Sequence, residues 1–269
     1  MNANLFVAAH ACLICDDVAE KCRLVVAMFE DWQAGRLDAD PAVELPDVTE
    51  AGRPPRPELV APRDLPRRRL GSPGGLAAMI HAVAHIEFNA INLACDAVYR
   101  FRDMPRDYYS DWIQVAREEA YHFSLLQNRL GELEHAYGDF PAHSGLWDLT
   151  VKTAHDPLLR MALVPRVMEA RGLDVTPDMM NRFRAAGDGR TADILKIILR
   201  DEVGHVAAGT RWFRYLCDQR GLEPDATYLG LYNEYFADGP RCPLHLEARR
   251  QAGFSDHELN VLESLCKKS

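Results

Sequence analysis

Glu-Glu-Ala-Tyr-His at residues 118–122 returns later in the chain as Asp-Glu-Val-Gly-His at residues 201–205. Each segment contains the pattern Glu-x-x-His. On a helix, residues three apart lie on one face, so a carboxylate and an imidazole at this spacing can bind the same ion. The repeated pattern therefore predicts two helices that each present a Glu/His pair, one from Glu119 and His122 and the other from Glu202 and His205.

Two more glutamates, Glu87 and Glu169, lie within apolar stretches of helical periodicity. A buried glutamate is costly unless it is paired or bound to a metal, so both positions require a partner. Glu87 precedes Glu119 by 32 residues, and Glu169 precedes Glu202 by 33. The chain therefore contains two similar halves, each a helix with a glutamate followed by a helix with Glu-x-x-His.

Four helices that contribute this set of residues are typical of a dinuclear carboxylate site inside a four-helix bundle. Carboxylates and imidazoles suit iron or manganese, and we expect two Fe ions, with Mn or a mixed Fe/Mn pair as the alternative. The competing interpretation is two surface Glu/His pairs and two buried glutamates paired with arginines, such as Arg166 and Arg171 near Glu169. The predicted metal ligands are Glu87, Glu119, His122, Glu169, Glu202 and His205.

A third Glu-x-x-His, formed by Glu132 and His135, serves as a comparison. Glu132 follows Glu119 by 13 residues, which at about 3.6 residues per turn places it on roughly the opposite side of the same helix. It also lies in a polar run near the expected helix end. We therefore predict that this third pair lies on the surface and binds no metal.

Helical periodicity extends over almost the whole chain, and no alternating β-branched run predicts a sheet. Ser72 and Pro73 are a plausible cap and first residue of a helix, whereas Pro165 and Gly172 predict a kink or an unwound segment beside Glu169. We expect helices at residues 5–35, 72–101, 106–136, 157–172 with a continuation after Pro177, and 191–221, with a connection at residues 137–155 and two or three short helices after residue 224.

Seven prolines make residues 36–71 an extended connection, which is also rich in arginine. We call this segment the strap and interpret it as a solvated cover or as a contact for an anion. The expected fold is all-α. It has an N-terminal helix and the strap at residues 1–71, a four-helix bundle with a long crossover at residues 72–221, and a helical extension at residues 222–269.

The composition is that of an ordinary globular protein, with 48% hydrophobic and 26% charged residues and a net charge of −9 over 269 residues. This acidity disfavours nonspecific nucleic-acid binding, because phosphates are neutralised by basic side chains. No signal peptide or uninterrupted apolar span is recognised, so a cytoplasmic location without a membrane partner is expected. Cys12-x-x-Cys15 has no second pair to complete a zinc site, and we interpret it as buried helix cysteines.

Both Glu-x-x-His segments, with the acidic residue before each, resemble the paired motifs of the ferritin-like superfamily. That superfamily includes rubrerythrins, acyl-carrier-protein desaturases and bacterial multicomponent monooxygenases. Over about residues 50–250 the chain resembles more closely a bacterial ferritin-like family of unknown function, through Pro54, Pro66-Arg67-Arg68-Arg69, His-Ile-Glu-Phe-Asn-Ala-Ile at 85–91 and Glu-Ala-Arg-Gly-Leu-Asp at 169–174. That family is loosely labelled rhamnosyltransferase, but the chain lacks the β/α alternation that binds a nucleotide sugar. A related branch hydroxylates a modified adenosine in tRNA.

The resemblance implies that all six predicted ligands hold the metals. It also implies that Asp201 hydrogen-bonds His122 across the site and fixes its tautomer, with Glu118 as a weaker candidate for the same role toward His205.

Two further residues near the motifs are not expected to be ligands. Tyr121 is turned about 160° around the helix from Glu119, and His85 is turned by about the same angle from Glu87. We interpret His85 as a core or second-surface histidine that pairs with His81.

From this site we expect an O2-dependent oxidoreductase, a hydroxylase or oxidase, with an unknown small-molecule or macromolecular substrate. This hypothesis predicts an apolar pocket beside the metals, lined by the strap and the C-terminal extension. The alternatives are a metal-handling, ferroxidase or peroxide-scavenging protein without an organic substrate, and a structural protein whose metals only stabilise the fold. An electron donor and a homodimer are left open. A tRNA substrate is disfavoured by the acidity and would use the arginines of the strap.

Overall fold

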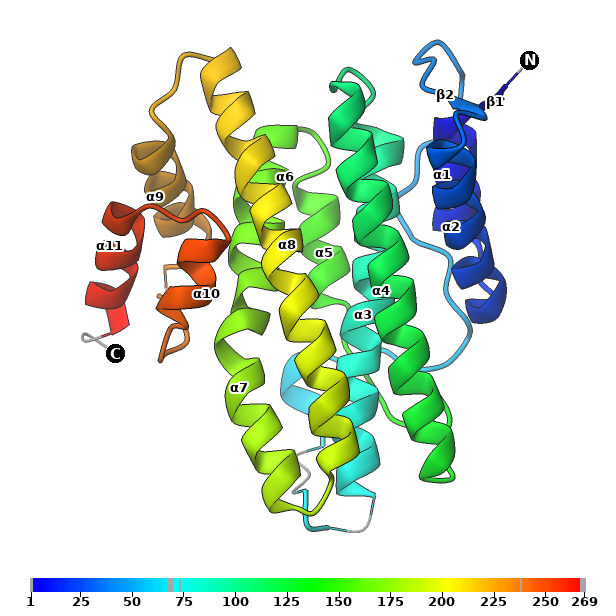
Figure 1. Cartoon of the computed structure of the whole chain (residues 1–269), viewed down its shortest axis with the longest axis vertical. Coiled ribbons are helices and arrows are strands. Elements are labelled where there is room, and N and C mark those ends of the chain that lie inside the picture. Colours follow the sequence, from blue (N-terminus) through cyan, green and yellow to red (C-terminus); the bar gives the residue numbers. More distant parts are fainter. Residues whose placement is uncertain (1, 67–69, 73, 238, 267–269) are drawn as a thin grey trace. The chain divides into compact units, whose positions relative to one another are not determined.

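The computed structural model describes residues 2–66, 70–72, 74–237 and 239–266. Its regular structure is almost entirely helical, which confirms the all-α prediction (Figure 1). The chain divides into two compact units, which we call the N-terminal unit (Met1–Val151) and the C-terminal unit (Lys152–Ser269). The finer division at residues 71 and 221 stays a prediction.

The N-terminal unit is built on two long helices, α3 (Gly75–Arg100) and α4 (Arg106–Glu132), which pack along each other. Helix α1 (Leu5–Ile14) packs on α3, and α2 (Val18–Gln33) packs on α4. Apolar side chains of α3 fill the space between these helices, so that most of α3 is buried. Among the described residues, α3 is the one helix long and apolar enough to cross a membrane, but its burial is that of a core helix.

The expected single helix at residues 5–35 is wrong, because the chain turns between α1 and α2. Cys15 has extended backbone geometry at the end of α1, and the Asp17 side chain accepts a hydrogen bond from the Glu20 amide and caps α2. An aspartate in this position satisfies an amide that the first helical turn leaves without a partner. Helical periodicity continues across the turn, which is why the sequence pattern alone did not reveal it.

Three other boundaries differ from the sequence expectation. Pro73 lies outside the described residues, and α3 is capped by Gly74, whose φ of 69° favours glycine. The expected connection at residues 137–155 contains a helix, α5 (Gly145–Lys152). Two short parallel strands, β1 (Ala3–Asn4) and β2 (Leu37–Asp38), pair where no sheet was expected.

Between β2 and residue 66, the described part of the strap has little regular structure apart from the 3-10 turn η1 (Pro62–Asp64) and a single β-bridge between Leu59 and Ala142. It is fixed to α1 at Gly52, whose amide donates to the Leu13 carbonyl over 2.9 Å. A Cβ atom at Gly52 would lie 2.1 Å from the Ile14 carbonyl oxygen, so this approach requires glycine. Arg67, Arg68 and Arg69 of the predicted basic strap lie outside the described residues.

The C-terminal unit is organised around the longest helix, α8 (Gly189–Gln219). Helices α6 (Pro157–Leu163) and α7 (Ala170–Ala185) pack on α8, and the π-helical turn η2 (Val164–Glu169) joins them and also contacts α8. The predicted distortion beside Glu169 is therefore present: Pro165 has no amide to donate, and the Ala170 amide reaches back five residues to the Pro165 carbonyl. The helix continues through both Gly172 and Pro177.

The described residues after α8 form three short helices, within the predicted two or three: α9 (Pro224–Tyr235), α10 (Leu246–Gln251) and α11 (Asp256–Cys266). We call α9–α11 the tail. A disulfide between Cys242 and Cys266, which the sequence pattern did not indicate, links the end of α11 to the segment before α10. Cys12 is buried in α1 as expected, whereas Cys15 is only partly buried at its end.

Candidate metal site

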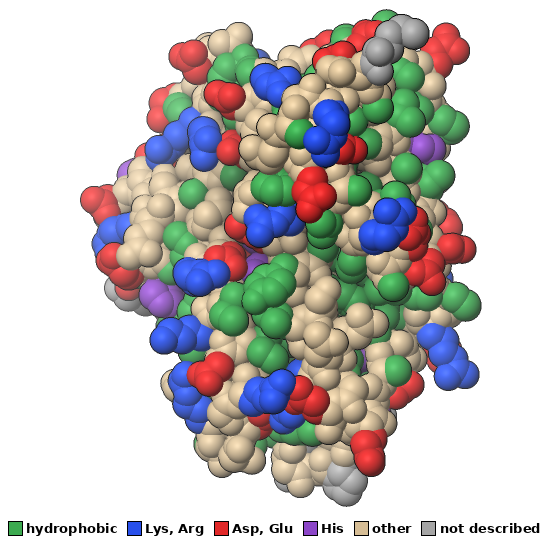
Figure 2. Space-filling view, turned by 45° about the vertical axis from the view of Figure 1, so that its right-hand side comes forward, with side chains coloured by type: hydrophobic (Ala, Val, Ile, Leu, Met, Phe, Trp, Pro, Cys, Tyr) green, Lys and Arg blue, Asp and Glu red, His purple; other side chains and the backbone are tan. Residues whose placement is uncertain are grey.

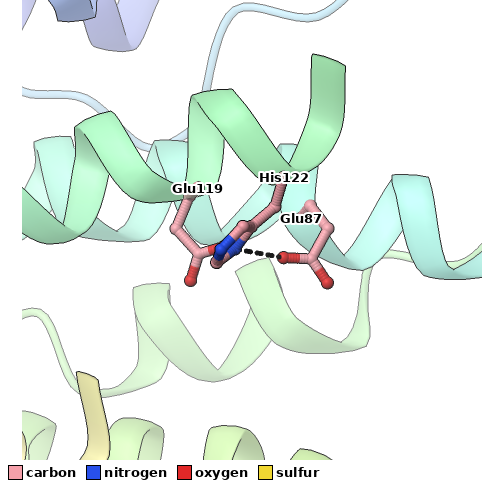
Figure 3. A group of neighbouring side chains, drawn as sticks. All are labelled: Glu87, Glu119 and His122. Carbon is pink, nitrogen blue, oxygen red and sulfur yellow. Dashed lines mark hydrogen bonds and ion pairs between the residues drawn. The ribbon is translucent and has the colours of Figure 1, made fainter. Parts of the chain in front are cut away.

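Three predicted ligands meet in the N-terminal unit, between α3 and α4 (Figure 3). The His122 Nδ1 atom donates to Glu119 Oε2 at 3.2 Å and lies 3.4 Å from Glu87 Oε2. Glu87 is 3% exposed, and Glu119 and His122 are fully buried. The helical spacing of three residues therefore places the α4 carboxylate and imidazole together, as predicted, and α3 adds the second carboxylate.

This group can hold a metal ion. Each of the three side chains offers one ligand atom, and these atoms lie within 4.8 Å of one another. Two carboxylates and an imidazole form a hard, oxygen-rich donor set, which suits iron, manganese or zinc better than copper(I). Burial strengthens the case, because buried carboxylates that face each other need a cation between them.

In the metal-free site, protons take the place of that cation. Burial and, to a smaller extent, the neighbouring Glu119 carboxylate raise the pKa of Glu87 to about 8. Burial disfavours the imidazolium form of His122, but the hydrogen bonds and charges of Glu119 and Glu87 outweigh that effect and raise its pKa to about 11. Near neutral pH the metal-free group therefore keeps a proton on both Glu87 and His122.

Metal binding should release these protons. The metal-binding forms are the Glu87 carboxylate and the neutral His122 imidazole, so the apparent affinity for Mn²⁺ or Co²⁺ should rise with pH, most steeply up to about pH 8. Calorimetric titration in two buffers of different ionisation enthalpy measures the number of protons released, which we expect to be about two for this group at pH 7. Zero proton release would show that the metal binds elsewhere.

The C-terminal unit carries the second Glu/His pair on α8. Glu202 is 9% exposed and His205 is 1% exposed, with the His205 Nδ1 atom 3.9 Å from Glu202 Oε2. Glu169, at the end of η2, is also buried, and η2 packs on α8. The two units thus repeat one arrangement, in which a buried glutamate on one helical segment accompanies a buried Glu-x-x-His on the next.

Arg166 and Arg171 are the two arginines that the alternative interpretation names as partners of Glu169. Arg166 is fully buried but binds Glu258 at 2.7 Å, and Arg171 is exposed. The sequence reasoning missed the Arg166–Glu258 pair, because the two residues lie 92 positions apart.

The acidic residues that precede each motif have local partners. Asp201 binds the Arg200 guanidinium at 2.7 Å, and Glu118 accepts a hydrogen bond from the Gln114 amide. Their predicted roles toward His122 and His205 stay predictions.

Tyr121 and the third Glu-x-x-His pair, which helical geometry excluded as ligands, do lie away from the buried metal-site group. Tyr121 is half exposed. In the comparison motif, Glu132 pairs with Arg129 at 2.8 Å, and the partly exposed His135 pairs with Asp139 at 3.3 Å. The prediction that this third Glu-x-x-His lies at the surface is therefore confirmed.

His81 and His85 belong to the protein interior, as interpreted. Both rings stack on Tyr137, whose hydroxyl lies 2.8 Å from His85 Nδ1, and His81 Nε2 accepts a hydrogen bond from the Gly138 amide. Burial lowers the pKa of each histidine to about 4, so both stay neutral.

A cavity of about 190 Å³ lies against His85, between α3 and the strap residues Leu65 and Pro66. The oxidoreductase hypothesis expected the strap to line a pocket beside the metals. The lining of this cavity includes the strap but not Glu87, Glu119 or His122. It is therefore not the expected pocket.

Comparison with known proteins shows which family this chain resembles. Residues 14–260 match a family described as a protein of unknown function, DUF455, and this range includes all six predicted ligands. An uncharacterized protein of Haemophilus influenzae is 44% identical over 252 residues, which cover 90% of this chain and 87% of that protein. No solved structure matches the chain.

Proposed function

This chain belongs to the DUF455 family of proteins of unknown function, and we propose that it is a dinuclear non-haem metal protein, with iron as the metal, that acts as an O2-dependent oxidoreductase. The observation that carries the proposal is the buried group of the N-terminal unit, in which two carboxylates from two helices face one imidazole. Such a group is costly to bury for stability alone, and a metal ion explains its composition.

The proposal of a second ion rests on the similarity between the two units. The C-terminal unit offers the same residue types in the same order, again buried. We propose that the six predicted ligands, three from each unit, would together hold one pair of ions. Four carboxylates would then balance two divalent cations, which is the ligand set of dinuclear sites in helical bundles.

When bound, a pair of iron ions would supply the two-electron reduction of oxygen or peroxide that oxidises a substrate. The protein side chains have other roles. Glu87 and His122 must each give up a proton before they can bind a cation, which couples loading of the site to pH. Ile91, Ala116 and Phe123, one helical turn from the ligands, are buried and keep water away from them. This low-polarity setting strengthens every charge interaction at the site.

The partners stay part of the proposal. A small-molecule or macromolecular substrate and an electron donor are expected, whereas nucleic acid is disfavoured. On the face shown in Figure 2, acidic and basic side chains are interspersed among the described residues, and they do not form one continuous basic patch. Nucleic-acid binding of the tRNA type would rely on such a patch.

Iron loading with and without oxygen separates the candidate functions. We expect about two iron ions per chain by elemental analysis and an oxygen-dependent charge-transfer absorption that decays when a substrate is oxidised. Glu132→Ala, which alters the surface motif, serves as the matched control and should behave like wild type. Iron turnover without any organic substrate would support the metal-handling alternative. Metal binding with no response to oxygen would contradict the oxidoreductase.

A further inference from the structure

The turn that ends in Glu169 is held by a buried arginine. Arg166 donates to Glu258 Oε1 on α11 over 2.7 Å and to Thr210 Oγ1 on α8 over 3.3 Å, and neither Arg166 nor Glu258 is exposed by more than 1%. The guanidinium lies 4.0–4.7 Å from three aromatic ring centres, those of Phe213, Tyr228 and Phe254. The Tyr228 hydroxyl, on α9, donates to the Arg166 carbonyl over 3.2 Å.

A second arginine holds the chain just after Glu169. Arg249 on α10 binds Asp174 at 2.7 Å and reaches the Ala170 carbonyl at 3.5 Å. The His245 amide, at the start of α10, also donates to Asp174 over 2.8 Å. Residues of the tail therefore contact the chain on both sides of Glu169. They bind Arg166 before it, and Ala170 and Asp174 after it.

On its other side, η2 rests directly on α8. A Cβ atom at Gly209 would lie 2.3 Å from the ring of Pro165, so glycine is needed for this approach. Gly209 follows His205 by one helical turn on α8. The position of η2 is thus fixed against the same helix that carries Glu202 and His205.

A π-helical turn needs such support. It has hydrogen bonds five residues apart instead of four, which in effect inserts one extra residue into the helix; it is rare and is frequently found at functional sites. Relaxation to α-helical geometry would rotate the side chains that follow the turn by about 100°, one residue's worth of helix. A buried ion pair adds little net stability compared with apolar packing, but it can specify one conformation.

We propose that the tail is a clamp that keeps η2 in its π-helical form and thereby positions the Glu169 carboxylate, with Arg166, Glu258 and Arg249 as positioning residues. This inference rests on the proposed function, because Glu169 is one of the proposed metal ligands. It gives the C-terminal extension a role in the site, although none of its residues is a ligand.

Glu258→Gln tests the clamp cleanly. Glu258 also accepts a hydrogen bond from the Ser255 amide at the start of α11, and glutamine preserves this capping role while it removes the charge that faces Arg166. Tyr228→Phe is a second, milder variant that removes only the hydrogen bond to the Arg166 carbonyl. Arg250→Gln, which breaks the exposed pair with Asp256 in the same tail, is the matched control.

Two readouts distinguish the clamp from the proposed function. The first is Co²⁺ binding, followed by stoichiometry and by the visible absorption of the bound ions. The second is hydrogen exchange of residues 164–170 in the metal-free protein. In Glu258→Gln we expect roughly tenfold faster exchange in this segment, a changed Co²⁺ spectrum and at least tenfold weaker binding of one ion. Tyr228→Phe should follow the same direction to a smaller extent, and Arg250→Gln should match wild type.

Unchanged exchange in both clamp variants would overturn the inference. So would faster exchange with Co²⁺ binding and spectrum identical to wild type, since the turn would then loosen without moving a ligand. If wild type itself bound no Co²⁺, the proposed function would fail, and with it the assignment of Glu169 as the group that the clamp positions. Faster exchange would in that case show only that the tail holds η2.

Discussion

His122→Ala should bind at least one metal ion fewer per chain than wild type, while Glu132→Ala should bind the full number. His122 is the residue that both buried carboxylates of the N-terminal unit contact, at 3.2 and 3.4 Å. Its removal leaves Glu87 and Glu119 facing each other with neither an imidazole nor its proton between them. Elemental analysis after loading and desalting measures the loss, and circular dichroism checks that the variant is folded.

The comparison is sharp because Glu132 belongs to the same sequence pattern on the same helix. It differs only in facing the surface, where Arg129 pairs with it. Glu202→Ala, in the other unit, should lose metal as His122→Ala does. Equal metal content in His122→Ala, Glu202→Ala and Glu132→Ala would show that the metal-binding faces of these helices were wrongly assigned.

Glu87→Gln should stabilise the metal-free protein at alkaline pH and weaken its response to metal. Burial and the Glu119 carboxylate raise the pKa of Glu87 to about 8, well above that of an unfolded chain. The folded state therefore keeps a proton that the unfolded state has already lost, so this group's contribution to stability is complete below about pH 4.5 and declines as the pH rises through 8. At pH 8.5 the decline should be on the order of 5 kcal/mol, at about 1.4 kcal/mol per pKa unit, and glutamine, which cannot ionise, avoids it.

Urea unfolding at pH 5, 7 and 8.5, with and without Co²⁺, measures both effects. Wild type should lose stability across this range when metal-free and regain it when loaded, because the cation replaces the protons. Glu87→Gln should show a flatter pH dependence and a smaller gain from metal. A metal-free wild type with no pH dependence between 5 and 8.5 would contradict the charged, buried group described for α3 and α4.

The local part of this architecture could be predicted from sequence. Glu119 and His122 share a helix face because their spacing fixes that geometry, and the burial of Glu87 followed from its apolar neighbours on one helix. The same arithmetic correctly placed Glu132 at the surface. Features that depend on a few turn residues were missed, as with Asp17, whose capping side chain starts a new helix within an unbroken helical period.

Contacts between residues far apart in the sequence could not be predicted from helical periodicity. Arg166 was named as a partner for Glu169 because the two are neighbours in sequence, but it binds Glu258 on α11. The disulfide between Cys242 and Cys266 was missed for the same reason, since nothing in the local pattern indicates which cysteines meet. The Arg166–Glu258 pair ties the tail to the rest of the C-terminal unit, whereas the disulfide links two parts of the tail itself. The sequence had described the tail only as short helices.

Anomalous diffraction from crystals loaded with manganese or iron tests the central claim most directly. We expect two peaks about 3.5–4 Å apart, one coordinated by His122 and the other by His205, with Glu87, Glu119, Glu169 and Glu202 around them. A single ion held by one triad, or two ions at distant positions, would contradict a shared dinuclear centre.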